Sequence, residues 1–250
     1  MKLDPKTKKF AAAAFLLLLW QAAAMLLNQK LLLASPADVI QRLFSIWREP
    51  AFFASVLFSF VRICAGFLLG FTVGVILAVI SGKYSAVKIL LQPVMATIKS
   101  VPVASFIILA LIWLNSSQLS VFISFLMVLP VIYNNVLSGI QSIDPKMLQM
   151  ADVFRIPWGK RFLFIWLPTI KPQLTAACST ALGLAWKSGI AAEVIGIPSR
   201  SIGEMLYSAK VYLNTVDLFT WTVIIVVISV LFEKFFMMLL RLFYRKLETL

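Results

Sequence analysis

Few side chains in this sequence are of the types that carry out catalysis or hold a metal ion. The chain contains no histidine, which removes the commonest general base and metal ligand. Cys64 and Cys178 lie in apolar stretches, and their spacing matches no metal or disulfide pattern, so we expect them to be packing residues. The phosphate-binding pattern Gly-x4-Gly-Lys-Ser/Thr is not found, since Leu77 stands where the first glycine would precede Gly82 and Lys83. We therefore predict that the chain is not an enzyme, and that any nucleotide it depends on is bound by another chain.

The amino-acid composition is that of an integral membrane protein. Of its 250 residues 61% are hydrophobic and 13% are charged, with a mean hydropathy of +0.96, whereas soluble domains are about half apolar and about a quarter charged. This composition excludes a soluble protein and a disordered one. The net charge is +13, but no basic face with interleaved aromatic residues occurs outside the apolar runs, so no nucleic-acid partner is expected.

Six apolar runs are each long enough to cross the bilayer core of about 30 Å as a helix. They cover about residues 10–28, 52–80, 89–114, 119–137, 174–195 and 218–240. The first run follows four lysines like a signal peptide, but no small-residue cleavage site clearly follows it, so we interpret it as an uncleaved span. The sequence therefore predicts an all-α integral membrane protein with six transmembrane helices in the lipid bilayer.

The basic residues between the runs predict the orientation. Fourteen Lys and Arg residues lie in segments 1–9, 81–88, 138–173 and 241–250, and five lie in the segments on the other side. Because Lys and Arg are enriched in cytoplasmic loops, we expect the first set of segments to be cytoplasmic. Both termini are then cytoplasmic as well.

Glycine and proline residues indicate where the helices approach closely or bend. Gly66, Gly70 and Gly74 recur every four residues, so they share one face of the second helix and predict a helix-packing surface. Pro102 and Pro130 remove backbone hydrogen bonds from the third and fourth runs, which we expect to kink or soften. A kink at Pro102 suits a helix that lines a pathway, but it is equally compatible with ordinary helix packing.

The cytoplasmic segment 138–173 is too long for a simple turn and carries helix signals of its own. Asp144 and Pro145 are typical of a helix N-terminus. Apolar residues then recur at helical spacing, at Met147, Met150, Ala151 and Phe154. Pro157 ends this helix and opens a second one, predicted over Trp158 to Phe164. The apolar stripe of such a helix-turn-helix fits the groove of a partner protein, and the alternative is a hairpin that lies on the membrane surface.

The same segment resembles a known family. The run QMADVFRIPWGKRFLFIWLP, residues 149–168, resembles the cytoplasmic "EAA" loop of ABC-importer permeases, whose pattern is Glu-Ala-Ala, three residues, Gly, nine residues, then Ile-x-Leu-Pro. The matching residues are Ala151, Ile165, Leu167 and Pro168, while Gln149, Met150 and Arg155 stand at the Glu, first Ala and Gly positions.

Three further segments resemble the nitrate/sulfonate/taurine-type permeases of that class. SFVRICAGFLLGFTVGVILAVISG, residues 59–82, resembles their second span, and ALGLAWKSGIAAEVIG, residues 181–196, resembles their fifth. Residues 102–113 resemble the third span, with Ile108 and Asn115 as departures from proline and glycine. The resemblance covers about residues 55–245 in order and spacing.

This resemblance implies a permease of the type I ABC importer kind in the inner (plasma) membrane of a bacterial cell. It implies one permease domain over residues 1–250, with its core fold over about 52–245 and a coupling loop over 138–173 between the fourth and fifth spans. The implied partners are a second permease copy, two cytoplasmic ATPase subunits that bind ATP and Mg²⁺, and an extracytoplasmic substrate-binding protein. The residues expected to contact the ATPase are Met147, Met150, Ala151, Phe154, Arg155 and Gly159.

The expected translocation-pathway residues are Lys99, Pro102, Lys187 and Glu193. Lys187 lies about 20 Å from the cytoplasmic end of the fifth run, and with Lys99 it would project a positive field that favours an anionic solute. Glu193 lies about 120° further around the same helix, so it forms no same-face pair with Lys187 and is expected nearer the outer gate. Snorkelling of Lys187 to the outer interface is the alternative.

Two other function classes are weighed against the permease. An ion-coupled secondary carrier or a channel would need intramembrane carboxylates, and only Glu193 and Glu233 lie in the runs, both near their ends. An intramembrane enzyme would need a metal or a nucleophile with its base, for which the candidates are poor.

Overall fold

The computed structural model describes residues 5–27, 29 and 31–248, and every regular element within them is a helix. The long helices are α1 (Pro5–Leu27), α3 (Pro50–Lys83), α6 (Ser116–Gln141), α9 (Leu167–Gly196) and α11 (Thr215–Glu248). The shorter ones are α2 (Pro36–Ile46), α4 (Ser85–Ser100), α5 (Val103–Ala110), α7 (Pro145–Val153), α8 (Trp158–Arg161), the π-helix η1 (Phe162–Trp166) and α10 (Ile202–Val211).

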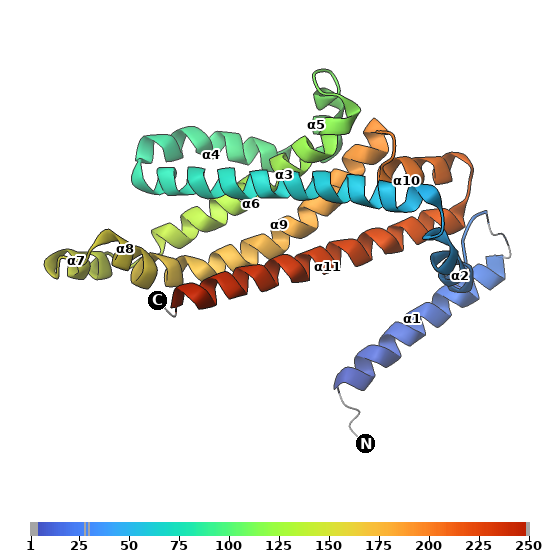
Figure 1. Cartoon of the computed structure of the whole chain (residues 1–250), viewed down its shortest axis with the longest axis horizontal. Helices are drawn as coiled ribbons and strands as arrows, with labels where there is room; N and C mark the ends of the chain where they lie inside the picture. The colour runs from blue at the N-terminus through green and yellow to red at the C-terminus, as the bar shows by residue number, and fades with distance from the viewer. Residues whose placement is uncertain (1–4, 28, 30, 249–250) are drawn as a thin grey trace.

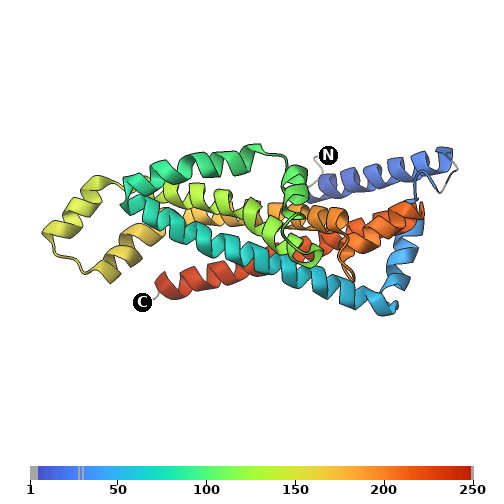
Figure 2. The same cartoon turned by 90° about the horizontal axis from the view of Figure 1, so that it is seen from above.

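The long helices α3, α6, α9 and α11 run along the length of the molecule (Figures 1 and 2). The connections α7 and α8 lie at one end, and α2 and α10 lie at the opposite end. Helix α1 diverges from this bundle, although Trp20 near its end meets the ring of Phe219 at 5.2 Å. The chain is therefore elongated, with its two sets of short helices at opposite ends of the spans.

Helix α6 forms the centre of the bundle because it packs closely against both α3 and α9. Its buried side chains Val128, Ile132 and Tyr133 join the main hydrophobic cluster. On the other side of that cluster, the buried Trp186 of α9 meets the ring of Phe232 at 6.4 Å. Aromatic rings thus fill the space between α9 and α11.

The glycine stripe of α3 packs against α6 of the same chain, as the predicted packing face requires. A Cβ atom on Gly66 would lie 2.4 Å from the carbonyl oxygen of Val121, and one on Gly70 would lie 2.8 Å from Cβ of Val128. A Cβ atom on Gly74 would lie 3.0 Å from Cβ of Ile132. These positions have no room for a side chain, so the glycines set how closely α3 and α6 approach.

The third apolar run is not one straight helix. Helices α4 and α5 meet at an angle of 101° across Val101 and Pro102. Proline supplies no amide hydrogen and disfavours a helical residue before it, which explains a break at this point. Pro130, in contrast, lies inside α6, which continues through it without a break.

Length and composition of the described helices identify fewer candidate spans than the six apolar runs. Among the described residues α3, α6 and α11 are long and apolar enough to cross a bilayer, and the bent pair α4 and α5 makes a fourth if it counts as one span. The apolar part of α1, Ala14–Leu27, is shorter. Helix α9 has 30 residues but is not among these candidates, since many of its residues are small or polar. Such residues suit a helix that packs closely against other helices, as α9 does. The total of six spans therefore stays a prediction.

Two helices occupy segments that we expected to be loops. Helix α2 begins at Ser35, whose hydroxyl oxygen accepts a hydrogen bond from the Asp38 amide at 3.1 Å. Helix α10 begins in the same way at Ser201, which accepts from the Glu204 amide at 2.9 Å. The ion pair of Arg42 with Asp217, at 2.5 Å, then holds α2 against the start of α11.

Substitution of Gly70 by alanine tests the packing of α3 against α6. We expect Gly70→Ala to lower the free energy of unfolding by about 1–3 kcal/mol, the usual cost of overpacking, because its methyl group has no room beside Val128. The measurement is thermal and denaturant-induced unfolding of the purified chain in detergent. Gly183→Ala is the matched control, since a Cβ atom there meets nothing within 4 Å, and it should leave stability unchanged or slightly raised. If the two substitutions changed the free energy of unfolding equally, the close packing of α3 against α6 at Gly70 would be contradicted.

Candidate functional site

The hairpin formed by residues 144–166 lies at one end of the bundle (Figure 1). As predicted, Asp144 caps its first helix, α7, and its carboxylate accepts a hydrogen bond from the Lys146 amide at 2.9 Å. The second helix, predicted over Trp158 to Phe164, does not end at Phe164: it starts as α8 (Trp158–Arg161). The chain then continues through η1 directly into α9, so the second arm of the hairpin is helical without interruption into the bundle.

The hairpin has an apolar interior of its own. Ala151 is fully buried there, in a cluster with Ile143 and Ile165. The Arg161 side chain ties the two arms together, since its Nε donates to the Ile156 carbonyl oxygen at 2.6 Å and a guanidinium nitrogen forms an ion pair with Asp152. These contacts hold the hairpin together as a compact unit.

The burial of Ala151 corrects the predicted contact face. Met147, Met150 and Phe154 are exposed as expected, with 73% of Phe154 accessible, but Ala151 points to the hairpin interior. Val153, with 78% accessible, is exposed alongside them. The prediction failed at Ala151 because a short helix with two apolar sides gives no sign of which side its own partner arm will cover.

The exposed apolar surface extends onto the second arm. Trp158 stacks on Phe162 with ring centroids 5.7 Å apart, and Trp158 and Phe164 are largely exposed. A Cβ atom on Gly159 would meet nothing within 4 Å, so this residue lies on open surface too. Exposed aromatic and methionine side chains of this kind are typical of a protein docking surface.

Arg155 has the backbone conformation of a helix-terminating glycine. Its φ angle is 48°, in the left-handed region. The Arg155 amide donates to the Asp152 carbonyl oxygen at 3.0 Å, and the Ile156 amide donates to that of Ala151 at 2.9 Å. This pair of hydrogen bonds is the Schellman motif, which favours glycine at the left-handed position. The site is the one where the family pattern has glycine, so a backbone requirement explains that pattern.

The residues predicted to line a pathway do not meet at one site within the described chain. Lys187 is exposed on α9, on a face that also carries Thr180 and Leu184. Lys99 is exposed in the last turn of α4, and Pro102 is exposed at the break before α5. Each of the three therefore faces away from the protein interior.

Glu193 lies about 120° around α9 from Lys187, and it does not line an open space. It is fully buried, and its Oε2 accepts hydrogen bonds from Ser59 Oγ at 2.6 Å and from the Gly203 amide at 3.3 Å. Ser59 Oγ in turn accepts from the Ile202 amide at 2.9 Å. The carboxylate therefore joins α9 to α3 and to the start of α10, which corrects its predicted place at a pathway.

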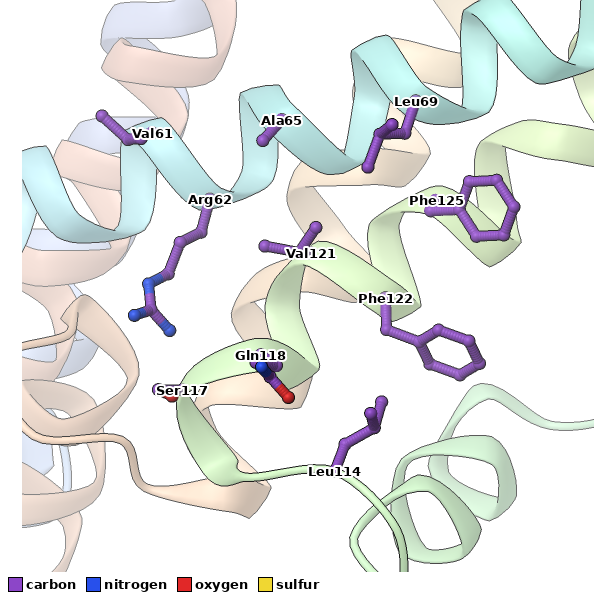
Figure 3. Close-up of a pocket in the computed structure, with 10 residues that line it drawn as sticks. All are labelled: Val61, Arg62, Ala65, Leu69, Leu114, Ser117, Gln118, Val121, Phe122 and Phe125. Carbon is purple, nitrogen blue, oxygen red and sulfur yellow. The ribbon is translucent and has the colours of Figure 1, made fainter.

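A groove between α3 and α6 was not predicted. It has a volume of about 780 Å³, and its apolar walls include Val61, Ala65 and Leu69 from α3 and Val121, Phe122 and Phe125 from α6 (Figure 3). Its polar lining residues are Arg62, Ser117 and Gln118. In the sequence, the one feature that could have indicated this groove is Arg62, a charged residue inside an apolar run.

Comparison with known proteins places the chain among transport proteins. Residues 70–249 match the family described as binding-protein-dependent transport system inner membrane component. A relative, the putative aliphatic sulfonates transport permease protein of Bacillus subtilis (strain 168), is 26% identical over 218 residues, which cover 86% of this chain and 77% of the relative. The taurine transport system permease protein of Escherichia coli (strain K12) is 24% identical over 213 residues, which cover 83% of this chain and 77% of the relative.

Two further comparisons agree. The bicarbonate transport system permease protein of Synechococcus elongatus is 22% identical over 200 residues, which cover 80% of this chain and 72% of the relative. A chain in the crystal structure of an amino acid ABC transporter with histidines has a TM-score of 0.58 at 18% sequence identity, covering 79% of this chain and 94% of that chain. At this identity the structural likeness supports the fold alone.

Replacement of Arg155 by glycine tests the hairpin geometry. We expect Arg155→Gly to stabilise the hairpin by about 1 kcal/mol, because glycine adopts the left-handed conformation without the clash of a Cβ atom. Hydrogen exchange of residues 145–156 should then slow by about fivefold. Phe154→Gly is the control, since Phe154 has a negative φ angle and glycine there should not slow exchange. Faster exchange in Arg155→Gly would contradict the Schellman assignment.

Proposed function

This chain belongs to the family of binding-protein-dependent transport system inner membrane components, and we propose that two copies of it form the membrane pathway of an ATP-driven importer. As an ABC importer permease it is a multi-pass membrane protein, not an enzyme, and it works with an ATPase and a substrate-binding protein. In our proposal the complex is a homodimer with two ATPase subunits, which bind ATP and Mg²⁺ on the cytoplasmic side. Family membership does not favour the ion-coupled carrier considered above.

The observation that carries the proposal is the apolar surface of hairpin 144–166. Met150, Val153 and Phe154 are exposed on a unit whose own interior is already packed, so this surface is free to enter a groove on a partner. The hairpin end of the bundle is then the cytoplasmic end, as the distribution of basic residues also suggests. Both termini are cytoplasmic in this arrangement.

The connection from the hairpin into α9 supports a mechanical role. Because α8, η1 and α9 follow one another without a loop, a displacement of the hairpin moves α9 as well. Closure of the ATPase subunits would thus rock α9 and the helices packed on it between inward-open and outward-open arrangements. The backbone can bend during this motion at two breaks, one at Pro102 between α4 and α5 and one at the turn between α7 and α8.

The exposed face of α9 supports a pathway between two copies. Lys187 lies nine residues before the end of α9, about 14 Å along the helix, where a charged side chain in contact with lipid is costly. A second copy opposite this face would enclose Lys187 in a water-filled passage together with Lys99. The positive field there favours an anionic or polar solute. The relatives named for aliphatic sulfonates, taurine and bicarbonate are consistent with such a solute.

Phe154→Asp tests docking of the ATPase. We expect it to reduce co-purification of the ATPase by at least about tenfold, because a carboxylate would be buried without a partner in the docked complex. Hydrogen exchange of the hairpin should not change, since Phe154 contributes little to its interior. Trp47→Asp, the same kind of change in an exposed aromatic residue at the opposite end, is the control and should retain the ATPase. Normal recovery of the ATPase with Phe154→Asp would count against the docking surface.

Lys187→Met tests the pathway. We expect uptake of a radiolabelled substrate by cells to fall at least about tenfold while membrane insertion and ATPase co-purification persist, because the positive field is lost and the docking surface is intact. Lys234→Met, which removes an exposed lysine from α11 instead, should leave uptake unchanged. Unchanged uptake kinetics in Lys187→Met would contradict the assignment of Lys187 to the translocation pathway.

A further inference from the structure

A pocket of about 400 Å³ lies between α3, α9 and α11 at the hairpin end of the bundle. Its walls are aliphatic and aromatic, and they include Phe71, Val75, Phe162, Leu174, Phe236 and Tyr244. Leu239 and Phe243 also line it and are exposed, so the pocket opens on the surface of the bundle. A ligand that matches these walls is an apolar chain that enters from the side of the helices.

The pocket lies at the edge of the hydrocarbon core. The apolar run of α11, about residues 218–240, is centred near residue 229. Phe236 then lies about 10 Å from the centre of the run and Tyr244 about 22 Å from it, at about 1.5 Å per residue. If the run is centred in the bilayer, whose core extends about 15 Å to each side, the pocket begins in the interfacial layer and reaches into the core. The glycerol backbone and the first part of an acyl chain of a phospholipid lie at this depth.

Tyr244 forms the interfacial end of the pocket. Its side chain is buried, with 3% accessible, and its hydroxyl has no hydrogen-bond partner among the described residues. Buried hydroxyl groups normally have a partner, so an acceptor from a bound molecule fits this position. The ester and phosphate oxygens of a phospholipid are acceptors of this kind.

The surroundings of Tyr244 are positively charged. Nζ of Lys171 lies 5.3 Å from the centroid of the Tyr244 ring. The segments 153–192 and 234–247, which supply the α9 and α11 sides of the pocket, contain several Lys and Arg residues and no acidic residue. This charge favours a lipid with an anionic head group over a zwitterionic one.

Phe162 connects the pocket with the exposed surface of the hairpin. It lines the pocket as the first residue of η1, and its ring stacks on that of Trp158 with centroids 5.7 Å apart. The end of α11 lies beside this part of the chain, where the hairpin joins the bundle (Figure 1). A chain that fills the pocket therefore supports Phe162 at the joint through which the hairpin moves α9.

We propose that this pocket binds an anionic phospholipid of the cytoplasmic leaflet, with part of one acyl chain along Val75, Leu174 and Phe236 and the head group beside Lys171. The bound lipid stiffens η1 and so strengthens the coupling between ATPase and permease. The proposal rests on the proposed function, which makes the hairpin end of the bundle cytoplasmic. It concerns regulation by the membrane and neither the solute nor its pathway.

The experiment uses phosphatidylglycerol that carries a photoreactive diazirine on one acyl chain. The purified full-length chain is irradiated in phosphatidylcholine nanodiscs that contain this lipid, and mass spectrometry of peptides locates the label. We expect the label to concentrate on the pocket segments 71–75 and 236–243. Unlabelled phosphatidylglycerol should compete at least about fivefold better than phosphatidylcholine, which is the effect of one basic side chain near a head group.

Three variants test the pocket and its charge. Val75→Phe places a ring in the pocket and should lower its labelling at least about fivefold, because methylene groups of the chain lose their buried position. Val226→Phe, the same change at an exposed position of α11 outside the pocket, is the matched control and should be labelled as the unchanged chain is. Lys171→Gln should remove the preference for phosphatidylglycerol, whereas Lys171→Arg should keep it. This last pair decides the test if Val75→Phe does not fold.

A second measurement tests the effect on coupling. In the complex with the ATPase, adding phosphatidylglycerol to phosphatidylcholine nanodiscs should raise the rate of ATP hydrolysis. Val75→Phe should lose this response while the ATPase still co-purifies. An unchanged response in Val75→Phe would overturn the coupling role.

Other results would overturn the lipid site itself. These are equal competition by phosphatidylcholine, label spread evenly over the exposed faces of α3 and α11, or unchanged labelling in Val75→Phe. Labelling of the isolated chain but not of the assembled complex would also overturn it and would identify the pocket as an interface between copies. If the ATPase co-purifies and cells take up substrate but the pocket is not labelled, the lipid site is wrong and the permease function stands.

Discussion

The close approach of α6 to both of its neighbours is the contact on which the rest of the bundle depends. In lipid there is little hydrophobic force between helices, so association relies on van der Waals contact between surfaces that fit. Glycines provide this fit on both sides of α6. On α3 they are Gly66, Gly70 and Gly74, and on α9 it is Gly189, where a Cβ atom would lie 2.6 Å from Ser124 Oγ. Because α6 is held between α3 and α9, the position of α9 follows from the backbone contacts rather than from large side chains.

The fixed position of α9 links the two ends of the molecule. At one end α9 continues into the hairpin, whose arms are tied by Arg161. At the other end its Glu193 accepts hydrogen bonds from α3 and from the first turn of α10. Gly203 permits this second connection, since a Cβ atom there would lie 2.3 Å from Cβ of Glu193. A helix anchored in this way at both ends can transmit a displacement with little loss, which is what coupling across a membrane requires.

The sequence predicts features that depend on one helix and misses those that depend on how helices meet. The stripe of Gly66, Gly70 and Gly74 and the cap at Asp144 follow from spacing and residue type, and both are found where expected. Helices α2 and α10 were missed although Ser35 and Ser201 are ordinary N-caps, because helices of 11 and 10 residues are too short to be identified as spans from hydropathy. The inward direction of Ala151 and the groove at Arg62 depend on contacts between distant parts of the chain, and no local pattern reports them.

The buried carboxylate of Glu193 is held by hydrogen bonds rather than by an ion pair. A bare carboxylate in an apolar interior is costly, and the nearest solution would be an ion pair with Arg62. Ser59 Oγ and the Gly203 amide donate to Glu193 instead, and the Ile202 amide donates to Ser59 Oγ. The two amides belong to the positively polarised start of α10. These neutral donors reach only Oε2, because Oε1 is buried without a hydrogen-bond partner among the described residues, so the positive charge of Arg62 also attracts and stabilises the carboxylate. The fold therefore holds one buried anion between α3, α9 and α10 by hydrogen bonds to one of its oxygens and by the attraction of the Arg62 cation on α3.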